Sequence, residues 1–223
     1  MNRFAKLAVA GGAVALAVPL AIILPEQFAP AADHVDPPQR TDPAVDDTPD
    51  RAADIADLFA AHTDDEFRIV LTFAGPAPTD QAATYDRNVL YKINVSNSAP
   101  RTTTDIPIRV RFGEDGRGSG KWGVQILGIP GTGDDGVFGP VETDNTMDGV
   151  QFRAGLFDDP FFFDDQGFLE SKMTGNLSIM NDRDFFANAN DTAIVITIPR
   201  DRIGDGSSPV DIWAETLRLG GQL

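Results

Sequence analysis

The stretch Ile106-Pro107-Ile108-Arg109-Val110-Arg111-Phe112 places an apolar side chain at every second position along most of its length. This period of two is typical of a β-strand that buries one face and exposes the other. The same alternation recurs in Phe67 to Phe73 and in Val89 to Val95. Further strands are predicted at 122–129, 149–156, 193–199 and 210–219. Turns rich in Gly and Asp separate these segments, so we predict an all-β domain with an antiparallel β-sandwich-like fold.

Two segments break this alternation and are expected to supply one or two short helices. Asp50 is a candidate N-cap for a short helix from Arg51 to Ala61, whose apolar face would consist of Ile55, Leu58 and Phe59. The second segment, Asp158 to Gly175, is rich in Phe but has no period of two. We expect it to form a short helix or a packed loop that plugs one end of the sheets.

The N-terminal sequence predicts export. Arg3 and Lys6 precede an uncharged apolar stretch at 7–24, and the small residues Ala29 and Ala31 follow. This order is typical of a secretory signal peptide, here residues 1–31, while an uncleaved membrane anchor is the alternative. Residues 32–50 then form an extended arm rich in Asp and Pro, and 51–223 form a single β-rich domain. The mature protein is expected to be periplasmic or secreted.

The charge of the chain limits the classes of partner that it is expected to bind. The 223 residues carry a formal net charge of −16 and contain no Cys. Such a charge repels phosphate, so no nucleic acid and no anionic membrane surface is expected as a partner. Divalent cations and a cell-surface or extracellular partner fit the charge and the predicted export. Without Cys there is no disulfide framework, no thiolate nucleophile and no Cys-based metal site.

Carboxylate density indicates a cation site, and calcium is the candidate cation, because calcium takes six to eight oxygen ligands. Three Asp-rich clusters qualify, at 33–50, 134–148 and 158–165. None matches the EF-hand pattern. The alternative is that these residues are solvated, because Asp is favoured in turns and an acidic surface aids solubility.

Catalytic motifs of the common kinds are absent from the sequence. It contains two histidines, His34 and His62, and neither position suggests a preorganised base. No Gly-x-Ser-x-Gly, His-Glu-x-x-His or Gly-x-x-x-x-Gly-Lys occurs. No catalytic residue is therefore predicted.

Several segments together resemble an uncharacterised bacterial exported family, catalogued as domain of unknown function 4331. The matching segments, in the family's order, are Asp33-His34-Val35-Asp36-Pro37, Ala53 to Phe59, Leu90 to Ile93, Arg153 to Asp164, Ala193 to Pro199 and Ile212-Trp213. The chain departs from the family's pattern at Leu156-Phe157, where a basic residue is common. The resemblance implies an exported protein and assigns no activity.

Two of the matching segments are rich in metal-ligating side chains, namely Asp33-His34-Val35-Asp36 and the stretch that begins at Asp158-Asp159. They lead to a hypothesis about the site. If the arm folds back on the sandwich, carboxylates and one imidazole from distant segments would surround a cation or form a buried polar network. The candidate ligands are His34, Asp36, Asp54, Asp57, Asp158, Asp159 and Asp164. The alternative is that Asp54 and Asp57 lie at a helix N-terminus and that Asp158 caps the segment after it.

Three classes of function follow from these observations. The first is a non-enzymatic binding or surface-interaction module, stabilised by a divalent cation. The second is a metal-assisted hydrolase that uses Asp carboxylates. The third is a structural or assembly protein, marked by an uncharged edge strand or an exposed Phe patch. The Phe residues between 157 and 186 belong to the core, line a ligand pocket or form a partner surface. Trp122 and Trp213 are core or platforms for sugar stacking.

Overall fold

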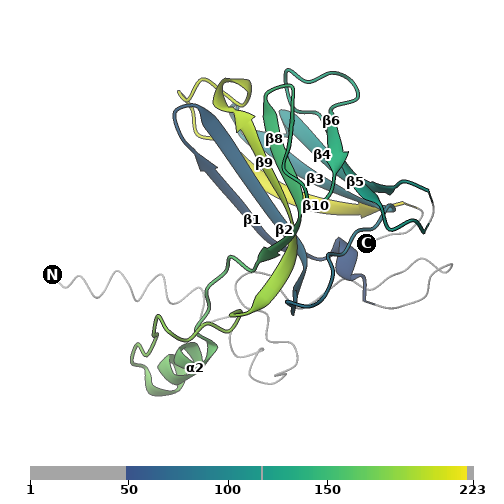
Figure 1. Ribbon diagram of the computed structural model, residues 1–223. Coiled ribbons are helices and arrows are strands. Elements are labelled where there is room, and N and C mark those ends of the chain that lie inside the picture. Colours follow the sequence, from purple (N-terminus) through teal and green to yellow (C-terminus); the bar gives the residue numbers. More distant parts are fainter. Residues whose placement is uncertain (1–48, 117, 220–223) are drawn as a thin grey trace.

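The computed structural model describes residues 49–116 and 118–219, and in this part ten strands form two sheets that face each other (Figure 1). The first sheet has the order β1 (Ile55–His62), β2 (Glu66–Pro78), β9 (Ala189–Pro199), β8 (Val150–Asp158) and β7 (Asn145–Met147). The second has the order β10 (Asp211–Arg218), β3 (Val89–Ser96), β4 (Ile106–Glu114), β5 (Trp122–Leu127) and β6 (Val137–Pro140). All neighbouring strands are antiparallel, which confirms the predicted all-β, sandwich-like fold.

The core lies between the two sheets and follows the sequence alternation. In β4, Ile108 and Val110 are fully buried while Arg109 and Arg111 are exposed on the outer face. Val110 is in register with Tyr91 on one side and with Ile126 on the other, and both are fully buried. Removing such side chains from water is the main favourable term in folding.

Aromatic rings connect the two sheets across the core. The ring centroids of Phe73 in β2 and Tyr91 in β3 are 4.3 Å apart, and Tyr85 lies 5.8 Å from Trp122. Trp122 packs against the core, which was one of the two alternatives predicted for it. Trp213 does not, because its neighbours Ile212 and Ala214 pack against the core and successive strand residues point to opposite faces.

The helix predicted at Arg51–Ala61 is wrong. The chain instead forms one 3₁₀ turn, η2 (Arg51–Ala53), and then strand β1. A shift of register between Ile55 and Leu58 marks an irregularity where the backbone N–H of Asp57 donates to Thr72 Oγ1 at 2.9 Å. The helix-like spacing of the apolar residues is therefore compatible with a strand, because an extra residue in a bulge changes which side chains share a face.

Asp50 does not cap a helix with its side chain. Its carboxylate is fully buried and forms an ion pair with the guanidinium of Arg218 in β10. Arg218 also donates to Asp86 Oδ2 at 3.0 Å. Burial works against the charged guanidinium, but the hydrogen bonds to the two carboxylates outweigh it and raise the pKa of Arg218. Except for positions 49 and 50, the predicted signal peptide and arm lie outside the described residues.

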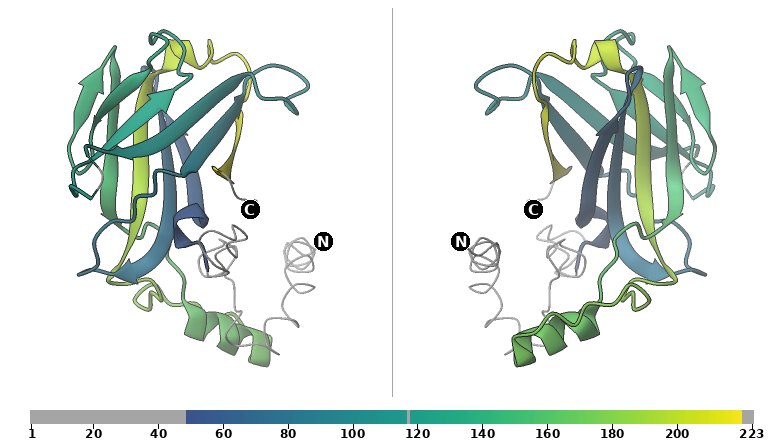
Figure 2. Two further views of the ribbon diagram at one scale, coloured as in Figure 1. Left: turned by 90° about the vertical axis from the view of Figure 1, so that its right-hand side faces the viewer. Right: turned by 90° about the vertical axis from the view of Figure 1, so that its left-hand side faces the viewer.

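Helix α2 (Asp165–Thr174) falls within the segment predicted as a helix or packed loop. It does not plug the sandwich. Figures 1 and 2 place it beyond the ends of β8 and β9, away from the space between the sheets. The described part of the chain has no helix that is both long enough and apolar enough to cross a membrane.

Candidate functional site

Residues 159–188, which we call the projecting segment, connect β8 to β9 and extend beyond the sandwich (Figure 2). The segment leaves the sheet between two opposed residues, because the backbone N–H of Asp159 donates to the carbonyl of Ala189 at 3.0 Å. The two strands therefore form a paired stem for the segment.

Helix α2 has clear start and stop signals. Asp164 is the N-cap, and its Oδ1 accepts a hydrogen bond from the backbone N–H of Gly167 at 2.8 Å. Gly175 ends the helix in the left-handed conformation, with φ of 71°. Position 167 requires glycine, because a Cβ there would lie 2.3 Å from Asp164 Oδ2 and 2.7 Å from the carbonyl of Ser178.

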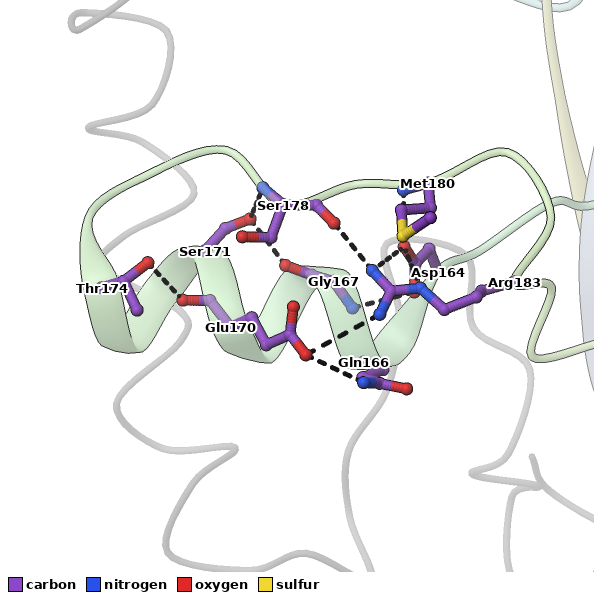
Figure 3. Close-up of polar contacts among 9 residues, drawn as sticks. All are labelled: Asp164, Gln166, Gly167, Glu170, Ser171, Thr174, Ser178, Met180 and Arg183. Carbon is purple, nitrogen blue, oxygen red and sulfur yellow. Dashed lines mark hydrogen bonds and ion pairs between the residues drawn. The ribbon is translucent and has the colours of Figure 1, made fainter.

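The Asp164 carboxylate also fastens the returning chain to the helix (Figure 3). Its side chain is fully buried, and Oδ2 accepts from the backbone N–H of Met180 at 2.7 Å and from Arg183 Nε and Nη2 at 3.1 and 2.9 Å. Burial disfavours the charge, but hydrogen bonds from Gly167, Met180 and Arg183 outweigh burial and lower the pKa of Asp164. One ionised carboxylate thus orders two stretches of the segment.

Two further hydrogen bonds hold the returning chain. Arg183 Nη2 donates to the carbonyl of Ser178 at 2.7 Å, and the backbone N–H of Ser178 donates to Ser171 Oγ at 2.8 Å (Figure 3). The Ser171 hydroxyl in turn donates to the carbonyl of Gly167 at 2.6 Å. The loop after α2 is therefore attached to the helix at several points.

The Phe residues of the segment pack mainly on one another. The ring centroids of Phe161 and Phe186 are 5.7 Å apart, and those of Phe163 and Phe168 are 5.6 Å apart. Phe186 is buried and none of these rings belongs to the sandwich core. The segment thus has a small aromatic cluster of its own.

Large apolar side chains are exposed on the projecting segment. Six of the ten exposed large apolar residues in the described chain lie there, namely Phe162, Met173, Leu177, Ile179, Met180 and Phe185. Leu177 is 86% exposed and Met173 is 78% exposed. If the segment plugged one end of the sheets, as predicted, such side chains would be buried. Exposed apolar side chains that gather in one region typically mark an interaction site.

The five predicted carboxylates that can be located lie toward the same end of the first sheet. Asp54 and Asp57 lie at the start of β1, and Asp158 and Asp159 at the end of β8. Strands β2 and β9 separate the two pairs, a distance of about 14 Å at the usual strand spacing. Asp164 is held by Arg183 in the projecting segment.

No group of three or more His, Cys, Asp or Glu residues that could hold a metal occurs within 49–116 and 118–219. His34 and Asp36 lie outside these ranges, so the calcium site that includes them stays a prediction. Asp158 does not cap α2, because Asp164 does. With no helix at Arg51–Ala61, Asp54 and Asp57 have no helix N-terminus to serve there.

Sequence reasoning missed three residues of this region. Asp191 is fully buried on β9, and its carboxylate packs so closely on Gly75 that a Cβ there would lie 1.4 Å from Oδ1. Arg183 and Met180 were also missed as partners of Asp164. Asp191 lies two residues before the strand predicted at 193–199, so no sequence signal placed it in a strand, and none existed for contacts spanning 16 to 19 residues.

Comparisons with family models, with curated proteins and with solved structures find no match to this chain. The resemblance to the exported family stays a prediction, and the functional argument rests on the residues described above.

Proposed function

We propose that the protein is an exported, non-enzymatic binding module that contacts a partner protein through the projecting segment. The observation that carries this proposal is the gathering of six exposed large apolar residues on one ordered segment outside the sandwich core. Burying Met173 and Leu177 in a partner would contribute roughly 1.5–3 kcal/mol for each side chain.

Charge defines the chemistry of the partner. The projecting segment contains six acidic and two basic residues, a net charge of −4. A partner surface with an apolar groove and a rim of Lys or Arg would complement it and accelerate association. The same charge disfavours a second copy of this segment and an anionic lipid surface as occupants.

Order within the segment also supports the proposal. Hydrogen bonds to Asp164 and Ser171 hold the loop after α2 against the helix. A preorganised contact surface loses little conformational entropy on binding, so more of the apolar contact energy remains as affinity.

A crosslinking experiment identifies the partner and tests the proposal. A photoreactive residue replaces Leu177 in the full chain. This variant is mixed with the secreted and periplasmic proteins of its source organism and then irradiated. The crosslinked protein is then purified and titrated against the wild-type chain, the Met173→Asp/Leu177→Asp variant and the control Leu219→Asp, whose side chain is 77% exposed outside the segment. We expect the double variant to bind at least about tenfold more weakly, the control to bind normally, and added salt to weaken binding.

Three outcomes would contradict the proposal. One is equal affinity of the double variant and the wild type for the purified partner. Another is flotation of the wild type, but not the variant, with phosphatidylcholine vesicles, which would assign the segment to a neutral membrane. The third is a dimer in ultracentrifugation that the variant abolishes, which would assign it to a second copy.

A further inference from the structure

A hollow of about 1020 Å³ lies on the outer face of the second sheet, on β4, β5 and β6. Gly113 and Gly123 are paired in register on neighbouring strands, and Pro140 is the next residue across the sheet. All three line the hollow. It lies on a different sheet from the stem of the projecting segment and is independent of the proposed function.

The surrounding structure does not require glycine at position 113. It lies within β4, and a Cβ there would meet no atom within 4 Å. At Gly136, in contrast, a Cβ would lie 2.0 Å from the carbonyl oxygen of Ile126, and φ is positive. Glycine within a strand weakens the strand and often marks a place where a ligand approaches the backbone closely.

A row of three side chains borders the glycines. Arg111, Gln125 and Phe138 are in register on β4, β5 and β6, and Phe138 is 54% exposed. Arg111 Nε and Nη2 donate to Gln125 Oε1 at 2.9 and 2.7 Å. Gln125 Nε2 donates to the carbonyl of Asp135 at 2.8 Å. The polar pair is thus held in place beside an exposed aromatic ring.

The other side of the hollow is also shaped by hydrogen bonds. Both oxygens of Glu114 accept backbone hydrogen bonds, from Gly118 and Gly120, each at 2.7 Å. These bonds lower the pKa of Glu114, so it remains a carboxylate at neutral pH. Asp115 and Lys121 add further polar groups to the lining.

We infer that this hollow binds a neutral oligosaccharide, with one sugar ring stacked on Phe138, its hydroxyls bonded to Arg111 and Gln125, and the next sugar lying over Gly113. The floor of the hollow is the face of β4 and β5, whose backbones are hydrogen-bonded to a neighbouring strand on each side, so a ligand lying over this floor adds no strand to the sheet there. The exposed ring of Phe138 beside the fixed polar groups of Arg111 and Gln125 suits a ligand with both a flat apolar face and hydroxyls, as a sugar has. The net charge of −16 favours a neutral ligand over an anionic one.

Calorimetric titration with three neutral hexasaccharides tests this inference, using the hexamers of β-1,4-glucose, β-1,4-N-acetylglucosamine and α-1,4-glucose. Gly113→Val adds a side chain at the floor of the hollow, where a Cβ meets no atom within 4 Å, and Phe138→Ala removes the stacking ring. We expect at least one hexasaccharide to bind the wild type, and both variants to weaken its binding at least about tenfold. The control Phe59→Ala, at a residue of β1 that is 38% exposed on the other sheet, should bind normally.

The same titrations can overturn the inference. It fails if no hexasaccharide binds the wild type, if either variant binds as well as the wild type, or if a sulfated oligosaccharide binds as tightly as the neutral one. Valine favours strands, so Gly113→Val should melt at or above the wild-type temperature. Because Phe138 is exposed, Phe138→Ala keeps the test decisive even if Gly113→Val fails to fold. Failure here leaves the crosslinking result at Leu177 unaffected.

Discussion

At the scale of single residues, the buried ion pair between Asp50 and Arg218 joins the first described residues to the last strand. Both side chains are almost completely buried, with 0% and 3% exposure. A buried charge is costly unless it is paired, so each residue depends on the other. Breaking this pair tests how firmly the start of the described chain belongs to the fold.

Asp50→Ala should destabilise the protein by about 3 kcal/mol, because among the described partners of Arg218 only Asp86 would remain. Urea unfolding followed by tryptophan fluorescence measures this change. Asp64→Ala is the matched control, since Asp64 is fully exposed and lies 3.7 Å from its cation, Arg200. The control should change the free energy of unfolding by less than about 0.5 kcal/mol. Equal effects of the two variants would show that the buried pair contributes nothing specific.

At the scale of elements, the projecting segment should open without the sandwich. Its order depends on Asp164, whose partners Gly167, Met180 and Arg183 all lie within the segment. Asp164→Asn should therefore raise amide exchange across residues 159–188 by about tenfold or more and leave the strands protected. Hydrogen exchange measured by mass spectrometry checks this expectation. Glu170→Gln is the control, because Glu170 lies 3.7 Å from Arg183 and is partly exposed.

Acid should open the same segment. The fold lowers the pKa of Asp164, so the ionised form stabilises the segment fully above the ordinary Asp pKa of about 3.9. That stabilisation is lost as the pH falls through the lower pKa of the folded state. Protection of 159–188, corrected for intrinsic exchange rates, should be constant from about pH 7 to 5 and fall below about pH 4. Loss of protection above pH 5 would show that another group controls the segment.

Local patterns predicted most of the strands but not the long-range contacts. Strand β4 was predictable because its alternation directly reports which face is buried. Residues 55–61 were wrongly predicted as part of a helix, because the register shift in β1 gives this strand the apolar spacing of a helix. The buried position of Asp191 and the pairing of Asp164 with Arg183 depend on contacts between segments, which no local pattern encodes.

At the scale of the whole molecule, the sandwich carries the two separate surfaces that we propose as contact sites. The projecting segment joins the end of β8 to the start of β9, and the glycine-floored hollow lies on the outer face of the other sheet. Each surface uses exposed aromatic or apolar side chains that the core does not need. In this proposal the sandwich is the support, and the binding properties belong to these two surfaces.

Removing the projecting segment tests whether the sandwich folds without it and whether binding depends on it. Residues 160–188 can be replaced by an Asn-Gly turn, because Asp159 and Ala189 already face each other across the stem. The decisive measurement is the affinity of this shortened chain for the protein that crosslinks at position 177. We predict a chain that melts within a few degrees of the wild type and shows no measurable binding. A shortened chain that binds the same protein with wild-type affinity would contradict the assignment of the projecting segment as the contact surface.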